Sequence, residues 1–201
     1  MSDNRFYYNI IPDYVFPKNG SILELGCGDG TSQLQSRHAE KFKTLEYVGI
    51  DKRTDLEKNL NIVTADIRNY QPEFKHDLLL AIATLEHIPF SYWENLKWLI
   101  DVDTVKNGYV VIVVPDNQKL EEYYNSKDYK LAYQYNSIHE VFSISKDFLE
   151  KWLPNIQIKR IHKPVKWKGK NVFTSVFRWF QCLLTRKFRK RYILLGVWQK
   201  E

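Results

Sequence analysis

The sequence predicts a doubly wound α/β fold, in which helices cover both faces of a mainly parallel sheet. Five short runs are apolar nearly throughout, which is typical of strands buried on both faces. Stretches with helical character separate these runs, and this alternation indicates parallel strands joined by crossover helices. The expected strands are SILELG (21–26), EYVGID (46–51), NIVTADI (61–67), HDLLLAIA (76–83) and YVVIVVP (109–115).

Three crossover helices are expected between these strands, over residues 31–42, 54–59 and 92–105. The first is the weakest, because few apolar residues offer it a buried face. The third is the clearest, because its large apolar side chains recur at helical spacing. Those side chains are Trp93, Leu96, Leu99 and Ile100.

Beyond the fifth strand, a polar stretch rich in tyrosine (119–137) precedes another helix. Ser145 is of a residue type that caps helix N-termini, and Pro154 should stop the helix that follows it. Two more strand candidates, 156–167 and 191–200, complete the pattern.

A basic amphipathic insert is expected near residues 168–190, between the last two strands. Phenylalanines recur there at helical spacing among arginines and lysines. Residues 1–156 contain 17 Lys and Arg against 23 Asp and Glu, whereas residues 157–201 contain 13 against 1. This asymmetry points to an anionic partner such as a membrane surface, a nucleic acid or a phosphorylated substrate. A solvated basic face that balances an acidic body is the alternative.

Length and composition favour a single domain over residues 1–201. A chain of 201 residues with 44% hydrophobic residues can bury one sizeable core. The N-terminus lacks the features of a secretory signal, and no apolar run is long enough to span a membrane. Cys27 and Cys182 are far apart, which favours reduced thiols over a disulfide or a zinc site. We therefore expect a cytoplasmic protein without a bound metal.

Three of the eight glycines fall within five positions, in the segment LELGCGDG (23–30). This segment follows the first expected strand, where a sharp turn into a helix leaves backbone N–H groups pointing into a crevice. Without a Cβ, Gly26, Gly28 and Gly30 would let a ligand come close to that backbone. A glycine cluster alone is a weak signal, because tight turns use glycine for conformational reasons.

Acidic residues near the ends of the first three strands indicate the kind of ligand. Asp51 ends the second strand, about 20 residues after the glycines, where an acid can accept hydrogen bonds from adenosine ribose hydroxyls. Asp66 ends the third strand, and Glu24 and Asp29 lie before and within the glycine turn. The GxGxG spacing differs from the GxGxxG of pyrophosphate sites, and the carboxylates favour a cation over a diphosphate. S-adenosylmethionine has an ammonium and a sulfonium group and no phosphate.

These motifs resemble those of the class I S-adenosylmethionine-dependent methyltransferases, over about residues 20–165. LELGCGDG is similar to the family's first motif, YVGID to its ribose-binding strand end, TADI to its adenine-side acid, and HDLLLAIATLEHIP to its fourth strand and active-site loop. VPDN and HEVFS resemble the small-molecule branch that includes ubiquinone-biosynthesis-type enzymes. The resemblance implies a Rossmann-like sheet of seven strands, the last antiparallel, and methyl transfer to a small-molecule acceptor by in-line displacement.

The resemblance also implies the cofactor contacts. The methionyl end would lie at the glycine turn, the ribose at Asp51 and the adenine at Asp66, with two residues closing the pocket behind the ligand. The implied cofactor-binding residues are Glu24, Gly26, Cys27, Gly28, Gly30, Asp51, Lys52, Asp66, Ile67, Thr84 and Leu85. Surface solvation or a helix end is the alternative explanation for Glu24 and Asp66.

Three residues are candidate general bases, needed only if the acceptor must lose a proton. Glu86 and His87 follow the fourth strand, where the methyl group should emerge, and His139 precedes the last crossover helix. Each has a structural alternative: the first two would fix their loop by hydrogen bonds, and His139 would hold the tyrosine-rich segment. Methyl transfer is an in-line displacement, and positioning the two reactants can by itself lower its barrier by about 7–11 kcal/mol.

The basic insert generates further hypotheses about partners. Its aromatic and basic side chains over residues 171–191, including Arg186, Lys187, Arg189 and Lys190, suit a helix at an anionic membrane interface. That would place the protein at the inner face of a membrane, and the acceptor would then be lipid-linked, for example a polyprenyl-bound sugar (a glycan) or a quinone precursor. The alternative is a helix that packs on the sheet.

Two other functions remain open from the sequence. An RNA methyltransferase could use the basic C-terminal segment to track phosphates, and a non-catalytic regulator could bind S-adenosylmethionine without turnover. A nucleotide-linked oxidoreductase is disfavoured, because its diphosphate would face Glu24 and Asp29.

Overall fold

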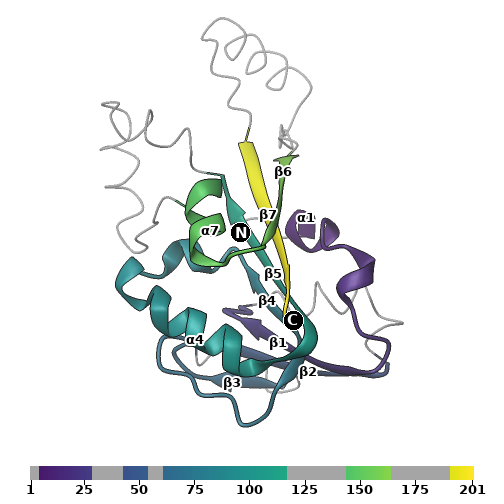
Figure 1. Ribbon diagram of the computed structural model, residues 1–201. Helices are drawn as coiled ribbons and strands as arrows, with labels where there is room; N and C mark the ends of the chain where they lie inside the picture. The colour runs from purple at the N-terminus through teal and green to yellow at the C-terminus, as the bar shows by residue number, and fades with distance from the viewer. Residues whose placement is uncertain (1–4, 29–42, 54–60, 117–143, 164–190) are drawn as a thin grey trace, which may run out of the picture.

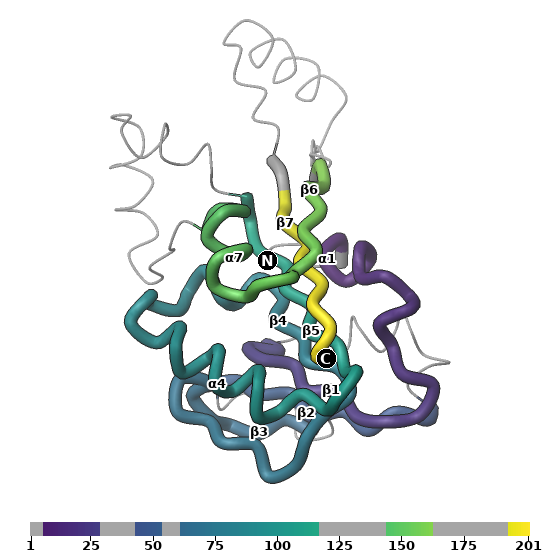
Figure 2. The backbone as a smooth tube through the Cα atoms, in the orientation of Figure 1, coloured from purple at the N-terminus to yellow at the C-terminus, as the bar shows by residue number. Residues whose placement is uncertain are grey.

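The computed structural model describes residues 5–28, 43–53, 61–116, 144–163 and 191–201 (Figures 1 and 2). The strands in this part of the chain are β1 (Gly20–Leu25), β2 (Leu45–Asp51), β3 (Ile62–Thr64), β4 (His76–Ile82), β5 (Thr104–Pro115), β6 (Gln157–Lys163) and β7 (Arg191–Gln199). The helices are α1 (Arg5–Asn9), α4 (Trp93–Asp103) and α7 (Lys146–Trp152), with 3-10 turns η1 (Asp13–Val15), η2 (Leu85–His87) and η3 (Phe90–Tyr92). The helices expected at 31–42 and 54–59, the tyrosine-rich stretch and the insert at 168–190 lie outside the described residues.

The strands form one sheet in the order β3-β2-β1-β4-β5-β7-β6. Strands β1 to β5 pair in parallel, whereas β7 pairs antiparallel with both β5 and β6. This topology confirms the predicted Rossmann-like sheet of seven strands with the last strand antiparallel. Because parallel strands end at the same edge of a sheet, the residues that follow β1, β2, β3 and β4 meet there.

The boundary between α4 and β5 differs from the prediction. The helix ends at Asp103 rather than at residue 105, and β5 begins directly at Thr104 rather than at residue 109. Thr104 pairs with His76, and the register then shifts. Asn107 has a φ of +64° in this irregular stretch. The sequence conceals this part of the strand because TVKNG (104–108) is not an apolar run.

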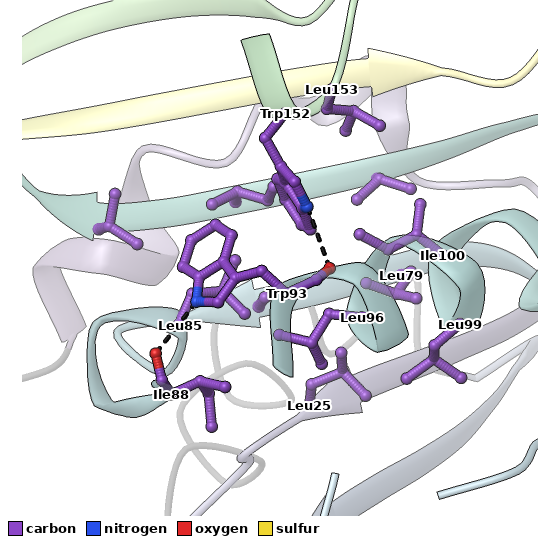
Figure 3. Close-up of a cluster of buried hydrophobic side chains, with 14 of the residues drawn as sticks. Leu25, Leu79, Leu85, Ile88, Trp93, Leu96, Leu99, Ile100, Trp152 and Leu153 are labelled. Carbon is purple, nitrogen blue, oxygen red and sulfur yellow. Dashed lines mark hydrogen bonds between the residues drawn. The ribbon is translucent and has the colours of Figure 1, made fainter. Parts of the chain in front are cut away.

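Helices α4 and α7 cover one face of the sheet (Figure 1). The predicted apolar stripe of α4 is buried, as Figure 3 shows. Its first member, Trp93, donates its indole N–H to the carbonyl of Ile88 at 3.0 Å, and Trp152 of α7 donates to the carbonyl of Trp93 at 3.1 Å. Ser145 caps α7 by accepting from the N–H of Phe148 at 3.1 Å, which confirms the predicted start of this helix. The helix ends before Pro154, also as predicted.

The segment before β1 covers the other face. It contributes Tyr8, Ile11, Val15 and Phe16, which are all buried. They pack with side chains of the central strands, namely Ile22, Tyr47, Leu78, Leu80, Val111 and Val113. This segment is too short and mixed in polarity for the sequence to reveal its role.

A buried pair joins the start of β4 to the end of α4. His76 Nδ1 and Asp103 Oδ1 lie 2.7 Å apart, and both side chains are at most 1% exposed. His76 Nε2 and Asp103 Oδ2 have no hydrogen-bond partner in the described part of the chain. The two side chains therefore depend on each other for their polar contact, since an unpaired buried polar group is costly.

Asp103→Ala should lower the free energy of unfolding by about 3 kcal/mol, because it leaves the buried His76 ring without its partner. His76→Ala should have a similar effect. Urea denaturation of both variants and of the double variant tests the coupling, and the double variant should lose at least about 1 kcal/mol less than the sum of the two. Strict additivity would show that the pair contributes no shared stabilisation.

Candidate active site

A cavity of about 350 Å³ lies at the edge of the sheet where β1, β2, β3 and β4 end. Seven of the fourteen predicted site residues line it. The predicted residues that line it are Gly26, Asp51, Lys52, Asp66, Ile67, Thr84 and His87. A larger cavity of about 570 Å³ lies at the opposite edge, between Trp98 and Trp198, but it contains none of the predicted site residues.

The turn after β1 needs glycine mainly because of a protein neighbour. Gly26 has a φ of +65°, and a Cβ there would lie 2.5 Å from Cγ2 and 2.6 Å from Oγ1 of Thr84. The Thr84 hydroxyl lies 3.0 Å from the carbonyl oxygen of Leu25 and 3.1 Å from that of Ile82. Thr84 therefore fastens the end of β4 to the end of β1. Gly30 lies outside the described residues.

Asp51 connects the end of β2 to the same turn. Its Oδ2 accepts the backbone N–H of Gly28 at 2.8 Å, and its Oδ1 accepts that of Arg53 at 2.9 Å. Cys27 strengthens the connection by donating its backbone N–H to the carbonyl of Ile50 at 3.0 Å. The Cys27 side chain is 2% exposed and is not among the cavity-lining residues, so its contribution to the site comes from its backbone.

Glu24 is buried below the turn and does not line the cavity. The Tyr8 hydroxyl donates to Oε1 at 2.7 Å, and the Tyr47 hydroxyl donates to Oε2 at 2.6 Å. Burial raises the pKa of Glu24 to about 7, although the two hydroxyls oppose this shift. Burial also raises the pKa of Tyr8, and the adjacent Glu24 adds to the effect. The carboxyl thus ties the N-terminal segment to the strands that carry the site.

Asp66 lies past β3, which ends at Thr64 rather than at residue 67 as predicted. The strand stops early because Asp66 Oδ1 accepts the backbone N–H of Arg68 at 3.0 Å and so forms a local turn. The Arg68 guanidinium also binds this carboxylate and holds its pKa below the usual range. Ile67, between them, is mostly buried and lines the cavity.

The 3-10 turn η2 carries the candidate bases that the structure describes. Leu85 is buried in the core that Figure 3 shows. Glu86 is 3% exposed, its Oε2 has no hydrogen-bond partner among the described residues, and burial raises its pKa to about 8. His87 is exposed and lines the cavity, whereas Glu86 does not. His139 lies outside the described residues.

Several contributors were not identified from the sequence. Tyr8 and Tyr47, the partners of Glu24, lie 16 and 23 residues from it in the sequence, and no local pattern connects them to it. Arg53 and Arg68 line the cavity beside the predicted acids. Their position two residues after Asp51 and Asp66 is a usable signal, because a backbone N–H at that spacing can bond the acid and form an Asx-type turn.

Gly26→Ala should destabilise the protein more than Gly28→Ala, although both residues have positive φ. Among the described residues, the atom nearest to a Cβ at Gly28 would be Asp51 Oδ2 at 3.8 Å, so that variant should lose only the conformational term of about 1 kcal/mol. Gly26→Ala adds the clash with Thr84 and should lose at least about 2 kcal/mol. Thermal and urea unfolding compare the two, and Thr84→Ala should recover part of the loss in Gly26→Ala. Equal losses in the two glycine variants would contradict the Thr84 explanation.

The chain matches the family described as "Methyltransferase domain" over residues 5–160. Two curated relatives are a malonyl-[acyl-carrier protein] O-methyltransferase from Ilyobacter polytropus and a trans-aconitate 2-methyltransferase from Escherichia fergusonii. The first is 33% identical over 91 residues, covering 40% of this chain and 32% of that protein. The second is 31% identical over 104 residues, covering 48% of this chain and 39% of that protein. The matched region thus spans well under half the length of these relatives.

Solved structures share the fold at low sequence identity. A SAM-dependent methyltransferase from Archaeoglobus fulgidus has a TM-score of 0.65 at 17% identity, over 98% of this chain and 94% of that one. Coclaurine N-methyltransferase, bound to N-methylheliamine and SAH, has a TM-score of 0.62 at 14% identity, over 98% and 70%. The family match covers most of the chain, so the expected class of protein is confirmed. The chain belongs to the methyltransferase domain family, with S-adenosylmethionine as the cofactor that this family indicates.

Proposed function

We propose that the protein transfers the methyl group of S-adenosylmethionine to a small-molecule acceptor. The observation that carries this proposal is the position of Asp51, which the N–H of Gly28 holds at a cavity shared with Asp66 and Ile67. The family supports the reaction, and the name of one curated relative, trans-aconitate 2-methyltransferase, supports a small acceptor.

The residues around the cavity suit the three parts of this cofactor. Asp51 accepts two backbone N–H groups, and a carboxylate has about four lone-pair sites, so it retains acceptor capacity for ribose hydroxyls. The turn at Gly26 would take the methionyl end, and Ile67 offers an apolar surface for the base. The volume of about 350 Å³ suits one nucleoside-sized ligand.

The reaction is an in-line displacement at the methyl carbon. A lone pair of the acceptor forms the new bond to carbon while the electrons of the carbon–sulfur bond move to sulfur, which leaves as a neutral thioether. The chain's main contribution is to hold the two reactants in line, which can supply about 7–11 kcal/mol. A scaffold fixed by hydrogen bonds and close contacts around Gly26, Thr84 and Asp51 suits that role.

Where the acceptor must lose a proton, His87 is the better-placed base of the two candidates on η2. It lines the cavity, and its backbone N–H is held by the carbonyl of Thr84 at 3.0 Å. Glu86, with a pKa of about 8, holds a proton at neutral pH and so cannot accept another. Its buried carboxyl suits a structural role.

A lipid-linked acceptor remains a prediction that depends on the basic insert at residues 171–191. Residues 171–190 lie outside the described part of the chain. Among the described helices, none is long and apolar enough to cross a bilayer. Methyl transfer from tritiated cofactor into cell fractions separated by lipid, sugar and RNA content would identify the acceptor class. Label in RNA alone would favour the nucleic-acid alternative.

Asp51→Ala should weaken the binding of S-adenosylhomocysteine about 10- to 100-fold, because it removes hydrogen bonds to a charged group. Titration calorimetry measures the dissociation constant of S-adenosylhomocysteine for both proteins. NAD is tested as a second ligand on the unaltered protein. Glu46→Ala is the matched control, since Glu46 is an exposed acid on the same strand. Preferential binding of NAD, or no binding of the sulfur ligand, would overturn the proposed function.

Glu86→Gln should change the pH dependence of stability. The folded-state pKa of about 8 exceeds the ordinary value of 4.5, so Glu86 contributes fully to stability below pH 4.5 and loses this contribution as pH rises through 8. Glutamine does not titrate. From pH 5 to pH 9, the free energy of unfolding of the variant should therefore rise by about 3–5 kcal/mol relative to that of the unaltered protein. Urea unfolding at pH 5 and at pH 9 measures this difference. Glu46→Gln, which replaces an exposed acid, is the control. Parallel pH profiles would exclude a buried protonated Glu86.

A further inference from the structure

The acid expected at the adenine, Asp66, is already bound by a neighbouring cation. Arg68 Nε lies 2.8 Å from each of its two oxygens, Nη2 donates to Oδ2, and the backbone N–H of Arg68 donates to Oδ1 at 3.0 Å. Each oxygen therefore has two contacts from Arg68. Since a carboxylate oxygen has about two lone-pair sites, Asp66 has little acceptor capacity left for an adenine amino group.

The same guanidinium has a second fixed contact. Its central carbon lies 5.1 Å from the centre of the Tyr92 ring, at the start of α4. A guanidinium is planar and weakly hydrated, and it stacks readily on π systems. The fork on Asp66 and the ring of Tyr92 thus hold Arg68 in place between the end of β3 and α4.

Arg68 borders the cavity beside apolar surface. Ile67, Ile88 and Pro89 line the same cavity and offer no hydrogen bonds from their side chains to a base. A neutral purine suits such a slot, because it combines a flat π surface with a preference for apolar neighbours and a cationic plane.

We propose that Arg68, held by Asp66 and Tyr92, is the residue that binds the adenine of the cofactor, by contact between its guanidinium and the ring. Asp66 then acts as a positioning residue that orients Arg68. This inference rests on the proposed function, since it assumes an adenosine ligand in the cavity. It assigns the selectivity for adenine to Arg68, which lies just after the TADI motif (64–67).

The test separates binding of the base from binding of the rest of the ligand. S-adenosylhomocysteine and S-ribosylhomocysteine differ by the adenine, so the ratio of their dissociation constants measures the contribution of the base. Arg68→Met should weaken S-adenosylhomocysteine about tenfold and leave S-ribosylhomocysteine within about twofold. Arg68→Lys keeps the charge without the planar fork and should lose at least about threefold on the adenine ligand alone.

Lys75→Met is the matched control, because it removes an exposed cation before β4, at the edge of the sheet opposite the cavity. Both of its dissociation constants should remain unchanged. If Arg68→Met fails to fold, Tyr92→Leu offers a second test, because it removes the ring that contacts Arg68. Like Arg68→Met, it should weaken the binding of S-adenosylhomocysteine more than that of S-ribosylhomocysteine.

The remaining outcomes decide against the inference in different ways. Equal weakening of both ligands would show a structural role for Arg68 only. Unchanged binding of S-adenosylhomocysteine by Arg68→Met would show that Arg68 does not bind the base, and tighter binding would show that Arg68 competes with the base for Asp66. If the unaltered protein binds neither ligand, the proposed function fails and this inference fails with it.

Discussion

The close contact between Gly26 and Thr84 is the constraint on which the geometry of the site depends. It brings the end of β1 against the end of β4, with no space for a Cβ between them. The second strand joins this unit when Asp51 accepts the N–H of Gly28. Three strand ends are thus fixed by backbone and short side-chain contacts before any ligand binds, and such preorganisation reduces the cost of ordering a ligand site.

Contacts on both faces of the sheet support this arrangement. On one face, Trp93 binds the carbonyl of Ile88 in the loop that borders the cavity, so the packing of α4 also positions the site (Figure 3). On the other, Tyr8 binds Glu24 two residues before the glycine turn. The N-terminal segment and α4 are distant in sequence from the glycine turn, yet each holds one side of the strands that carry it.

Sequence alone was sufficient for the parts of the molecule that depend on local patterns. Apolar runs located β1 to β5, two further strand candidates matched β6 and β7, helical spacing located α4, and the Ser145 cap located the start of α7. It did not locate the α4–β5 boundary, because the polar start of β5 becomes a strand only by pairing with His76. The partners of Glu24 and the neighbour of Gly26 were also out of reach, since each depends on a residue 16 or more positions away.

The electrostatic argument for a cationic ligand changes once the acids are seen in place. Glu24 does not face the cavity as a bare charge, because its oxygens accept two tyrosine hydroxyls and burial raises its pKa to about 7. Asp66 is balanced by Arg68. Glu24, one of the two acids on which the argument against a diphosphate rests, therefore repels such a ligand less than the sequence suggests, and Asp29, the other, lies outside the described residues. The size of the cavity and the acceptor capacity of Asp51 must then carry more of the selectivity.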